Sequence, residues 1–267
     1  MNVGPGGPPT RCDSAGVCRR SYFQAFKLPA EFLAAARIDT AALGHNVMAV
    51  VPGIDSALAH EWIVVGAHFD HLGQTGYGVR DPRNASAPHL GADDNASGTA
   101  AVLEIARRLS ASPARRSVLF VHFGAEELGL IGSSVFMLAP PIPIGAMVAM
   151  VNLDMVGRLE RGRLQLFGLE SSRQWGRVID GANAGEPIPL ARNPSPLPDG
   201  AASDHIPFFR AGVPVVHLFT GLHGQYHTKD DTADRIDFDG LVRIVEFTER
   251  LVRLLGDGTA LPKRAAR

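Results

Sequence analysis

The sequence contains few of the features that would mark a disulfide scaffold or a common zinc-binding motif. Its 267 residues include two cysteines, Cys12 and Cys18, in a segment rich in glycine and proline. These form either a small disulfide loop in an oxidising compartment or two free thiols. Neither a C-x-x-C nor an H-E-x-x-H motif occurs, which excludes the commonest structural zinc sites and the zincin arrangement.

The chain also lacks long apolar runs and a strong charge of one sign. No stretch approaches the roughly 20 apolar residues that a spanning helix needs, and the formal net charge is −1. We therefore expect no membrane span and no general attraction to nucleic acid. The first 21 residues lack the apolar centre of a signal peptide, so the sequence predicts either a cytoplasmic protein or a chain that starts after a removed or misplaced signal.

Apolar and amphipathic segments alternate through most of the chain. Val102, Ile105, Ala106 and Leu109 recur at helical spacing, for example, and predict one buried helix face. We expect strands at 46–53, 61–70, 117–124, 146–154, 163–168 and 213–220, and helices at 97–112, 130–138, 172–184 and 241–255. Strands that are apolar on both faces indicate an α/β fold, with a central, mostly parallel (mixed) sheet and helices on both faces.

The same pattern divides the chain into three parts. Residues 1–44 are predicted to be an N-terminal tail and a lead-in segment with a short helix at 29–38, because their beginning is rich in glycine, proline and arginine. Residues 45–257 form the main domain, and residues 258–267 are a C-terminal tail. Within the domain, residues 76–97 form a long loop, and loops of that length are usually functional or disordered.

Acids and histidines follow several of the predicted strands. In α/β sheets, ligands bind beyond the carboxyl ends of the strands, so these side chains are expected to converge. They are His68, Asp70 and His71 after the second strand, Glu126 and Glu127 after the third, Asp154 after the fourth, His223, Tyr226 and His227 after the last, and Asp93 and Asp94 before the first helix.

Each of these residues has an ordinary explanation when it is taken alone. A histidine after a strand is more often a hydrogen-bonded loop residue than a ligand, and an aspartate before a helix is most often a cap. The other histidines, His122, His205 and His217, keep that ordinary interpretation. Taken together, however, several carboxylates in one cleft repel one another unless cations neutralise them. Two histidines with three carboxylates suit zinc, with cobalt or manganese as alternatives.

The order of the motifs then resembles a known family. The segments "AHFDHLG", "LGADDNASGTAAVLEIAR", "GAEELGLIGS", "VNLDMVG", "SDHIPF" and "YHTKDDTADRID" are similar to those of the co-catalytic di-zinc aminopeptidases. That family includes bacterial leucyl aminopeptidases, aminopeptidases S and Y, and glutamate carboxypeptidases, with glutaminyl cyclases as relatives. The resemblance covers about residues 45–255 and implies a zinc-exopeptidase fold with a metallopeptidase catalytic domain at 45–257.

The resemblance also implies a metal site with two Zn²⁺ ions, for which Co²⁺ or Mn²⁺ could substitute. His68 and Asp154 would bind one ion, and Glu127 and His227 the other. Asp94 would bridge the two ions. No other cofactor is implied.

Four further residues receive roles from the same resemblance. Glu126 would be the general base, and Asp70 would hold the His68 ring and fix its tautomer. Tyr226 matches a tyrosine that, in some members, hydrogen-bonds the oxyanion. Asp93 keeps a structural interpretation.

The expected function is therefore that of an exopeptidase acting on peptide substrates, most simply an aminopeptidase. A carboxypeptidase or dipeptidase of the same family, a single-zinc glutaminyl cyclase and a non-catalytic receptor-like module are the alternatives. The last two fit less well, since the full ligand set and Glu126 are present. Many relatives are exported, so the resemblance favours a periplasmic or secreted protein, although this chain shows no signal peptide. The sequence does not determine side-chain specificity or oligomeric state.

Overall fold

The computed structural model describes residues 10–12, 18–20, 44–74, 77–159, 162–196, 202–258 and 261–263, which form two compact units, Met1–His45 and Asn46–Arg267. In the first unit, β1 (Thr10–Cys12) pairs antiparallel with β2 (Cys18–Arg20), and Cys12 lies opposite Cys18. The cysteine side chains, the lead-in helix at 29–38 and most of the N-terminal tail lie outside the described residues. Those predictions stay predictions.

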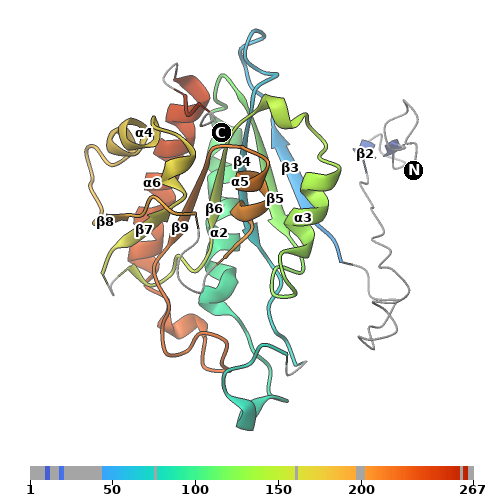
Figure 1. The fold of residues 1–267 in the computed structure, drawn as a ribbon, viewed down its shortest axis with the longest axis vertical. Coiled ribbons are helices and arrows are strands. Elements are labelled where there is room, and N and C mark those ends of the chain that lie inside the picture. The colour runs from blue at the N-terminus through green and yellow to red at the C-terminus, as the bar shows by residue number, and fades with distance from the viewer. Residues whose placement is uncertain are drawn as a thin grey trace. The chain divides into compact units, whose positions relative to one another are not determined.

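A seven-stranded mixed sheet forms the centre of the second unit (Figure 1). Its order is β3-β5-β4-β6-β9-β7-β8. Strands β5, β4, β6 and β9 are parallel neighbours, β3 and β7 run antiparallel to this group, and β8 is parallel to β7. The strands are β3 (Val47–Val51), β4 (Trp62–His68), β5 (Ser117–Phe123), β6 (Met147–Leu153), β7 (Leu164–Phe167), β8 (Leu190–Arg192) and β9 (Val215–Phe219).

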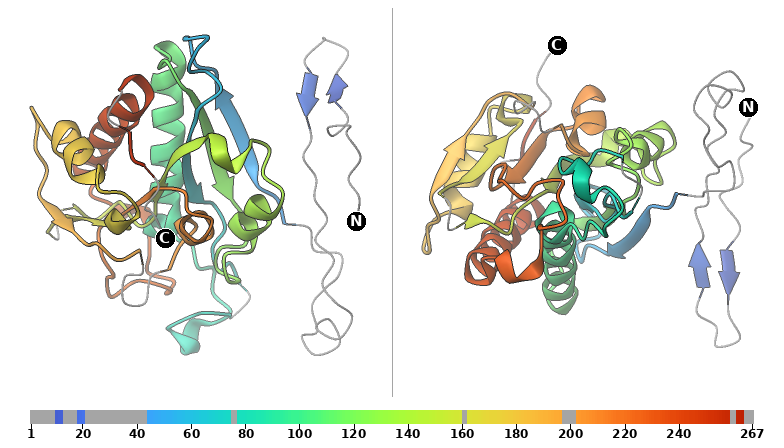
Figure 2. Two further views of the ribbon diagram at one scale, coloured as in Figure 1. Left: turned by 45° about the horizontal axis from the view of Figure 1, so that its top comes forward. Right: turned by 90° about the horizontal axis from the view of Figure 1, so that it is seen from below.

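Helices cover both faces of the sheet (Figure 2). They are α2 (Gly98–Ala111), α3 (Ile131–Leu138), α4 (Trp175–Ala182), α5 (His205–Arg210) and α6 (Phe238–Asp257). Alternate residues of β4 show the two-sided burial: Ile63 and Val65 belong to the core beneath α2, α4 and α6, whereas Val64 packs with Phe136 and Phe208 beneath α3 and α5. This confirms the predicted α/β fold with helices on both faces.

Two features of the fold differ from the simplest expectation. The first two predicted strands of the domain, β3 and β4, follow each other in the chain but are not neighbours, because β5 inserts between them. Strand β8 and helix α5 were not predicted. Both are short, with three and six residues, and such segments carry too little periodicity to be recognised.

Helix α2 begins very close to the end of β6. The Asn95 side chain accepts a hydrogen bond from Gly98 N at 3.0 Å, so Asn95 caps the first N–H group of the helix. A Cβ at Gly98 would lie 2.5 Å from Leu153 O. Glycine therefore lets the loop that carries Asp94 approach the strand that ends beside Asp154. No helix among the described residues is long and apolar enough to cross a membrane.

Candidate metal centre

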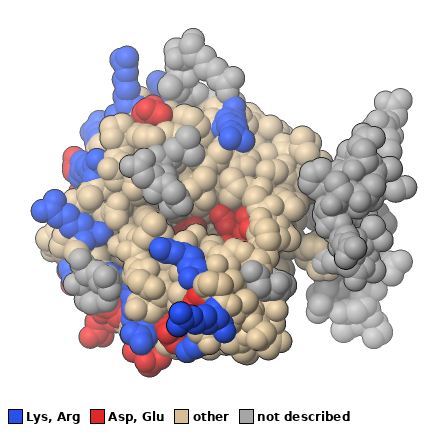
Figure 3. Space-filling view, turned by 60° about the horizontal axis from the view of Figure 1, so that its bottom comes forward, with Lys and Arg blue, Asp and Glu red and all other residues tan. Residues whose placement is uncertain are grey.

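The predicted site residues come together at the carboxyl ends of the parallel strands. Acidic side chains are visible in a hollow of the surface in Figure 3. His68 is the last residue of β4, Asp154 follows β6 directly, and Glu126 and Glu127 follow β5. The segment Ala92–Ser97 (η2), a distorted helical turn before α2, brings in Asp94. His227 lies in the loop after β9. Parallel neighbouring strands end at one edge of the sheet, which explains this convergence.

Non-glycine residues with positive φ gather near this edge. Among the described residues they are Ala125 (φ 57°), Leu130 (φ 59°), Met155 (φ 50°) and His227 (φ 57°). Ala125 directly precedes Glu126, and Met155 directly follows Asp154. Each left-handed residue of this kind costs on the order of 1 kcal/mol or more and persists only when its surroundings hold it. Backbone strain is therefore concentrated where the acidic side chains turn into the site.

His68, Asp94 and Asp154 form the first group of potential ligands. His68 Nε2 lies 3.3 Å from Asp94 Oδ1 and 3.3 Å from Asp154 Oδ1. Burial alone would lower the pKa of His68, but these two carboxylates outweigh it and raise the pKa well above its usual value. The two carboxylates therefore favour the protonated form of His68 when no metal is bound.

His227, Asp94 and Glu127 form the second group. His227 Nε2 lies 3.2 Å from Asp94 Oδ2 and 3.1 Å from Glu127 Oε2. Asp94 thus presents one carboxylate oxygen to each histidine, as a bridging ligand would. Burial acts to lower the pKa of His227, but hydrogen bonds with Asp94 and Glu127 outweigh this effect and raise the pKa to about 10.

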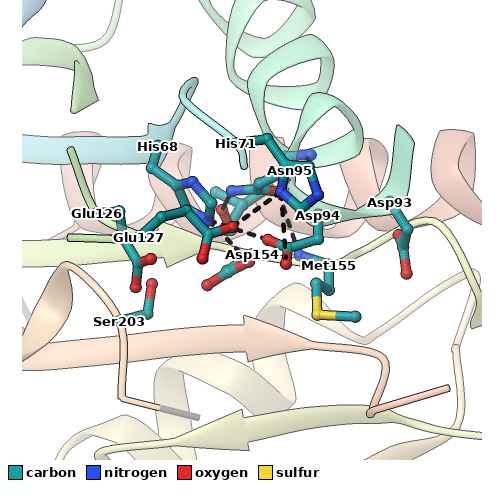
Figure 4. Close-up of polar contacts among 12 residues, drawn as sticks. His68, His71, Asp93, Asp94, Asn95, Glu126, Glu127, Asp154, Met155 and Ser203 are labelled. Atoms are coloured by element: carbon teal, nitrogen blue, oxygen red, sulfur yellow. Dashed lines mark hydrogen bonds and ion pairs between the residues drawn. The ribbon is translucent and has the colours of Figure 1, made fainter. Parts of the chain in front are cut away.

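His71 also reaches the second group, and sequence reasoning gave it no role. Its Nδ1 lies 2.8 Å from Glu127 Oε1 and 3.8 Å from Asp94 Oδ2. Its position three residues after His68 was the available signal, but spacing alone could not show that the turn after β4 aims both rings at the same cluster (Figure 4). Glu127 therefore lies between two histidines.

Asp70 holds the backbone at which the glutamate pair begins. Its carboxylate accepts hydrogen bonds from Glu126 N at 3.1 Å and Glu127 N at 3.3 Å. His68 Nδ1 lies 3.1 Å from the Asp70 backbone oxygen and 3.8 Å from the Asp70 carboxylate. The nearer contact of the His68 ring is thus the Asp70 carbonyl, whereas the carboxylate chiefly fixes the glutamates.

The two adjacent glutamates lie in opposite environments. Burial raises the pKa of Glu127, but hydrogen bonds from His227 and His71 outweigh it and lower the pKa to about 2. Burial raises the pKa of Glu126 well above its usual value, and the charge of His68 only partly opposes this shift. In Figure 4 no dashed contact reaches the Glu126 carboxylate. One glutamate is therefore paired with histidines, and its neighbour is not.

A pocket opens beside these side chains. It is lined by the acids Asp94, Glu126, Glu127 and Asp154 and by Met155, Ala202, Phe219, Leu222 and Tyr226. Tyr226 packs with Met155, Phe167 and Phe219, and its ring stacks on His227 with centroids 3.8 Å apart. Burial and the nearby carboxylates raise the pKa of Tyr226, so its hydroxyl stays protonated and able to donate. The pocket is thus lined by both acidic and apolar side chains.

The donor atoms fit zinc. Ligand atoms about 2.0–2.2 Å from one tetrahedral zinc lie roughly 3.3 Å apart, which is close to the 3.1–3.3 Å spacing between the ring nitrogens and carboxylate oxygens of both groups. His227 Nε2 is a buried atom, and its near neighbours are carboxylate oxygens of Asp94 and Glu127, so one metal ion could bind all three atoms. Nitrogen and carboxylate oxygen are also the donors that zinc accepts.

Asp93 lies outside this cluster, and its side chain points away from Asp94 (Figure 4). Its carboxylate accepts a hydrogen bond from Gly157 N at 2.7 Å and lies 3.1 Å from His223 Nε2. Asp231, which sequence reasoning missed, accepts hydrogen bonds from the backbone N–H groups of Asp93 and Asp94 at 2.9 and 3.0 Å. These buried contacts hold the backbone of the loop that carries Asp94 in place.

Comparison with known proteins gives a family match over most of the chain. The model of Peptidase family M28 matches residues 46–252. Aminopeptidase YwaD of Bacillus subtilis is 31% identical over 186 residues, covering 61% of this chain and 40% of that protein. Leupeptin-inactivating enzyme 1 of Streptomyces exfoliatus is 30% identical over 244 residues, covering 83% of this chain and 50% of that protein.

Solved structures with a similar fold include a zinc aminopeptidase and a glutaminyl cyclase. A zinc aminopeptidase from Bacillus subtilis has a TM-score of 0.63 at 26% identity, covering 83% of this chain and 51% of that one. A glutaminyl cyclase from Porphyromonas gingivalis has a TM-score of 0.64 at 22% identity, covering 79% and 77%, a likeness that concerns the fold. The chain spans about half the length of the curated relatives that it matches.

Proposed function

Since this chain belongs to Peptidase family M28, we propose that it is a zinc-dependent aminopeptidase that hydrolyses the N-terminal peptide bond of peptides. The observation that carries this proposal is the sharing of Asp94 between two histidine–carboxylate groups, His68 with Asp154 and His227 with Glu127. This arrangement supports two zinc ions per chain. Cobalt and manganese accept the same donors and are proposed substitutes.

His227, rather than His71, is the proposed ligand of the second ion. Its Nε2 is close to both carboxylates, whereas the nearest nitrogen of His71 is 3.8 Å from Asp94. His71 would instead hydrogen-bond Glu127 and fix its orientation, which is the usual role of a residue behind a ligand. Asp70 would position the glutamate pair through its backbone contacts.

Glu126 is the proposed general base. When bound, two zinc ions polarise the scissile carbonyl and lower the pKa of a water molecule at the site. Glu126 lines the pocket, and no hydrogen bond or ion pair joins its carboxylate to another residue drawn in Figure 4, so its carboxylate is free to take the proton of the attacking water. It then passes that proton to the departing amine. Tyr226, which remains protonated and lines the same pocket, would donate a hydrogen bond to the oxygen on which negative charge develops.

The walls of the pocket support a preference for an apolar N-terminal residue. Met155, Phe219 and Leu222 line the pocket together with the acids, and buried apolar contacts favour an aliphatic or aromatic side chain. The acidic residues of the lining favour the free α-amino group of the substrate, which is a cation. A carboxypeptidase would need a cationic group for the substrate carboxylate, and none lines this pocket among the described residues.

A substrate comparison tests the proposal. Zinc-loaded protein is assayed with leucyl-anilide, acetyl-leucyl-anilide and short peptides, and the products are identified by mass spectrometry. We expect cleavage of the free-amine substrates and little or none of the acetylated one. Equal turnover of leucyl-anilide and its acetylated form would overturn the aminopeptidase assignment and leave a metal-dependent hydrolase. Conversion of N-terminal glutamine to pyroglutamate without hydrolysis would favour the cyclase alternative. The exported location remains a prediction.

A further inference from the structure

The candidate ligand His227 is held differently from the other potential ligands. His68 ends a strand, and Asp154 follows one directly, whereas His227 lies in a loop eight residues after the end of β9. Its backbone is in the left-handed region, with φ of 57°. A non-glycine residue there needs support from its surroundings. Most of that support comes from a segment far away in the sequence.

Residues 77–89 supply these contacts. His227 Nδ1 lies 2.9 Å from Gly78 O, and the carbonyl of His227 accepts a hydrogen bond from Arg80 N at 2.8 Å. The contact of Nδ1 with Gly78 O turns the opposite nitrogen, Nε2, toward the carboxylates of Asp94 and Glu127, where a metal would bind. The Arg80 guanidinium also lies 5.8 Å from the centroid of the Tyr226 ring, which stacks on His227.

A contact between the side chains of Asp81 and His89 holds this segment together. Asp81 Oδ1 lies 2.8 Å from His89 Nε2, and Asp81 Oδ2 accepts a hydrogen bond from Lys229 N at 3.2 Å. The His89 side chain is fully buried, and its other ring nitrogen lies 2.9 Å from Ala87 O. His89 N donates to Gly73 O at 2.8 Å, which closes the base of the loop. Asp81 thus joins both arms of the loop to the backbone just after His227.

We propose that residues 77–89 act as a clamp on the metal centre, in which Asp81 and His89 are positioning residues that hold His227 in its metal-binding orientation. Neither residue touches the reacting atoms. This proposal rests on the proposed zinc centre. It adds that zinc binding at the Glu127–His227 position should require the contact between Asp81 and His89. Occupancy at the His68–Asp154 position should not, because that group is fixed by the ends of β4 and β6.

Zinc binding to Asp81→Ala tests the clamp. Asp55→Ala is the matched control, because Asp55 forms a similar contact with Arg115 at 2.7 Å but lies outside the pocket lining. Affinities are measured by competition with a chromophoric zinc chelator, and the thermal midpoints of the metal-free proteins are recorded. We expect Asp81→Ala to weaken one of two zinc ions about 10–100-fold, as loss of a partner behind a ligand typically does. The other ion should keep its affinity, and Asp55→Ala should bind both ions normally.

A double-mutant cycle separates positioning from general stability. If Asp81 acts through His227, then Asp81→Ala should change zinc affinity less than about twofold in a His227→Ala background, because coupled residues are not additive. Asp81→Asn, which keeps an oxygen for Lys229 N, should give a smaller loss than Asp81→Ala. An equal loss with and without His227, or unchanged zinc affinity in Asp81→Ala, would overturn the clamp alone. Wild-type protein that binds no zinc would overturn the proposed function, and the clamp with it.

Discussion

Two pairs of histidines in this chain lie in opposite surroundings. His68 and His227 face carboxylates, which raise the pKa of both rings. His205 and His217 stack on each other with centroids 4.4 Å apart and are fully buried. Burial lowers the pKa of His205 to about 4 and that of His217 well below its usual value. The neighbourhood therefore decides whether a histidine is a potential ligand or a neutral part of the core.

The same contrast holds for the acids at the pocket. Hydrogen bonds from two histidines outweigh burial and lower the pKa of Glu127, whereas burial raises the pKa of Glu126 and the charges of Asp154 and Asp204 add to that rise. Histidines and glutamates near the pocket therefore each divide into two kinds. His68, His227 and Glu127 pair with groups of opposite charge, whereas His205, His217 and Glu126 form no such pair among the described residues. The predictions below test this division.

The largest effect on activity is expected from substitution of Glu126, the glutamate without a histidine contact in Figure 4. Glu126→Gln keeps the side-chain size and all proposed ligands but cannot accept a proton. Its kcat should fall about 10²–10⁴-fold, as is typical after loss of a general base, which corresponds to roughly 3–5.5 kcal/mol of the barrier. KM and metal content should change little. Steady-state kinetics and elemental analysis on one preparation measure all three.

Substitution of Glu127, which contacts two histidines, should reduce metal binding instead. Glu127→Gln replaces an anionic ligand with a neutral one, so it should lose one ion, and excess zinc should restore part of its activity. If Glu126→Gln loses metal while Glu127→Gln keeps both ions, the two roles are reversed. Full activity in both variants would show that the site is elsewhere.

The two proposed histidine ligands should contribute differently to the free energy of unfolding of the metal-free protein. His68 is 1% exposed, and its removal leaves Asp94 and Asp154 facing each other without a cation. We expect His68→Ala to destabilise the metal-free fold by about 1–3 kcal/mol, the usual cost of leaving buried polar groups unpaired. His227→Ala, at the edge of the pocket, should cost less than about 1 kcal/mol. Urea unfolding of both variants in chelator gives the comparison, and equal losses would contradict it.

The stacked pair should act on stability through pH. The pKa of His205 is about 4 in the folded protein and about 6.5 when unfolded, so the unfolded chain binds the extra proton first. Stability is complete above pH 6.5 and falls as pH drops toward 4. The loss reaches about 3 kcal/mol, since one pKa unit corresponds to about 1.4 kcal/mol.

His205→Phe keeps a ring against His217 but cannot titrate. Its metal-free form should therefore lose less stability than the wild type between pH 6.5 and 4. Chemical denaturation at several pH values measures the difference. Parallel curves for the two proteins would show that His205 is not a buried neutral base.

Much of this organisation could be predicted from the order of residues. The long β4, β5 and β6 segments are apolar on both faces, and that pattern predicted a central sheet in an α/β fold. The acids and histidines that follow them were expected to meet, because parallel strands end at one edge. The motif order also indicated the family that the comparisons identify. Short elements such as α5, with six residues, escaped prediction because they hold less than two helical turns of pattern.

What the sequence by itself determined is therefore the set of chemical groups at the strand ends and the type of fold that gathers them. Only the tertiary structure decided their partners. It placed His71 against Glu127, turned the Asp70 carboxylate toward the backbone of the glutamate pair, and joined Asp81 and His89 to the loop that carries His227. The physical reason is that periodicity records which side of an element is buried, whereas a contact between loops depends on backbone turns with no repeating pattern. Residues separated by 149 positions, such as Gly78 and His227, are brought together only by the tertiary fold.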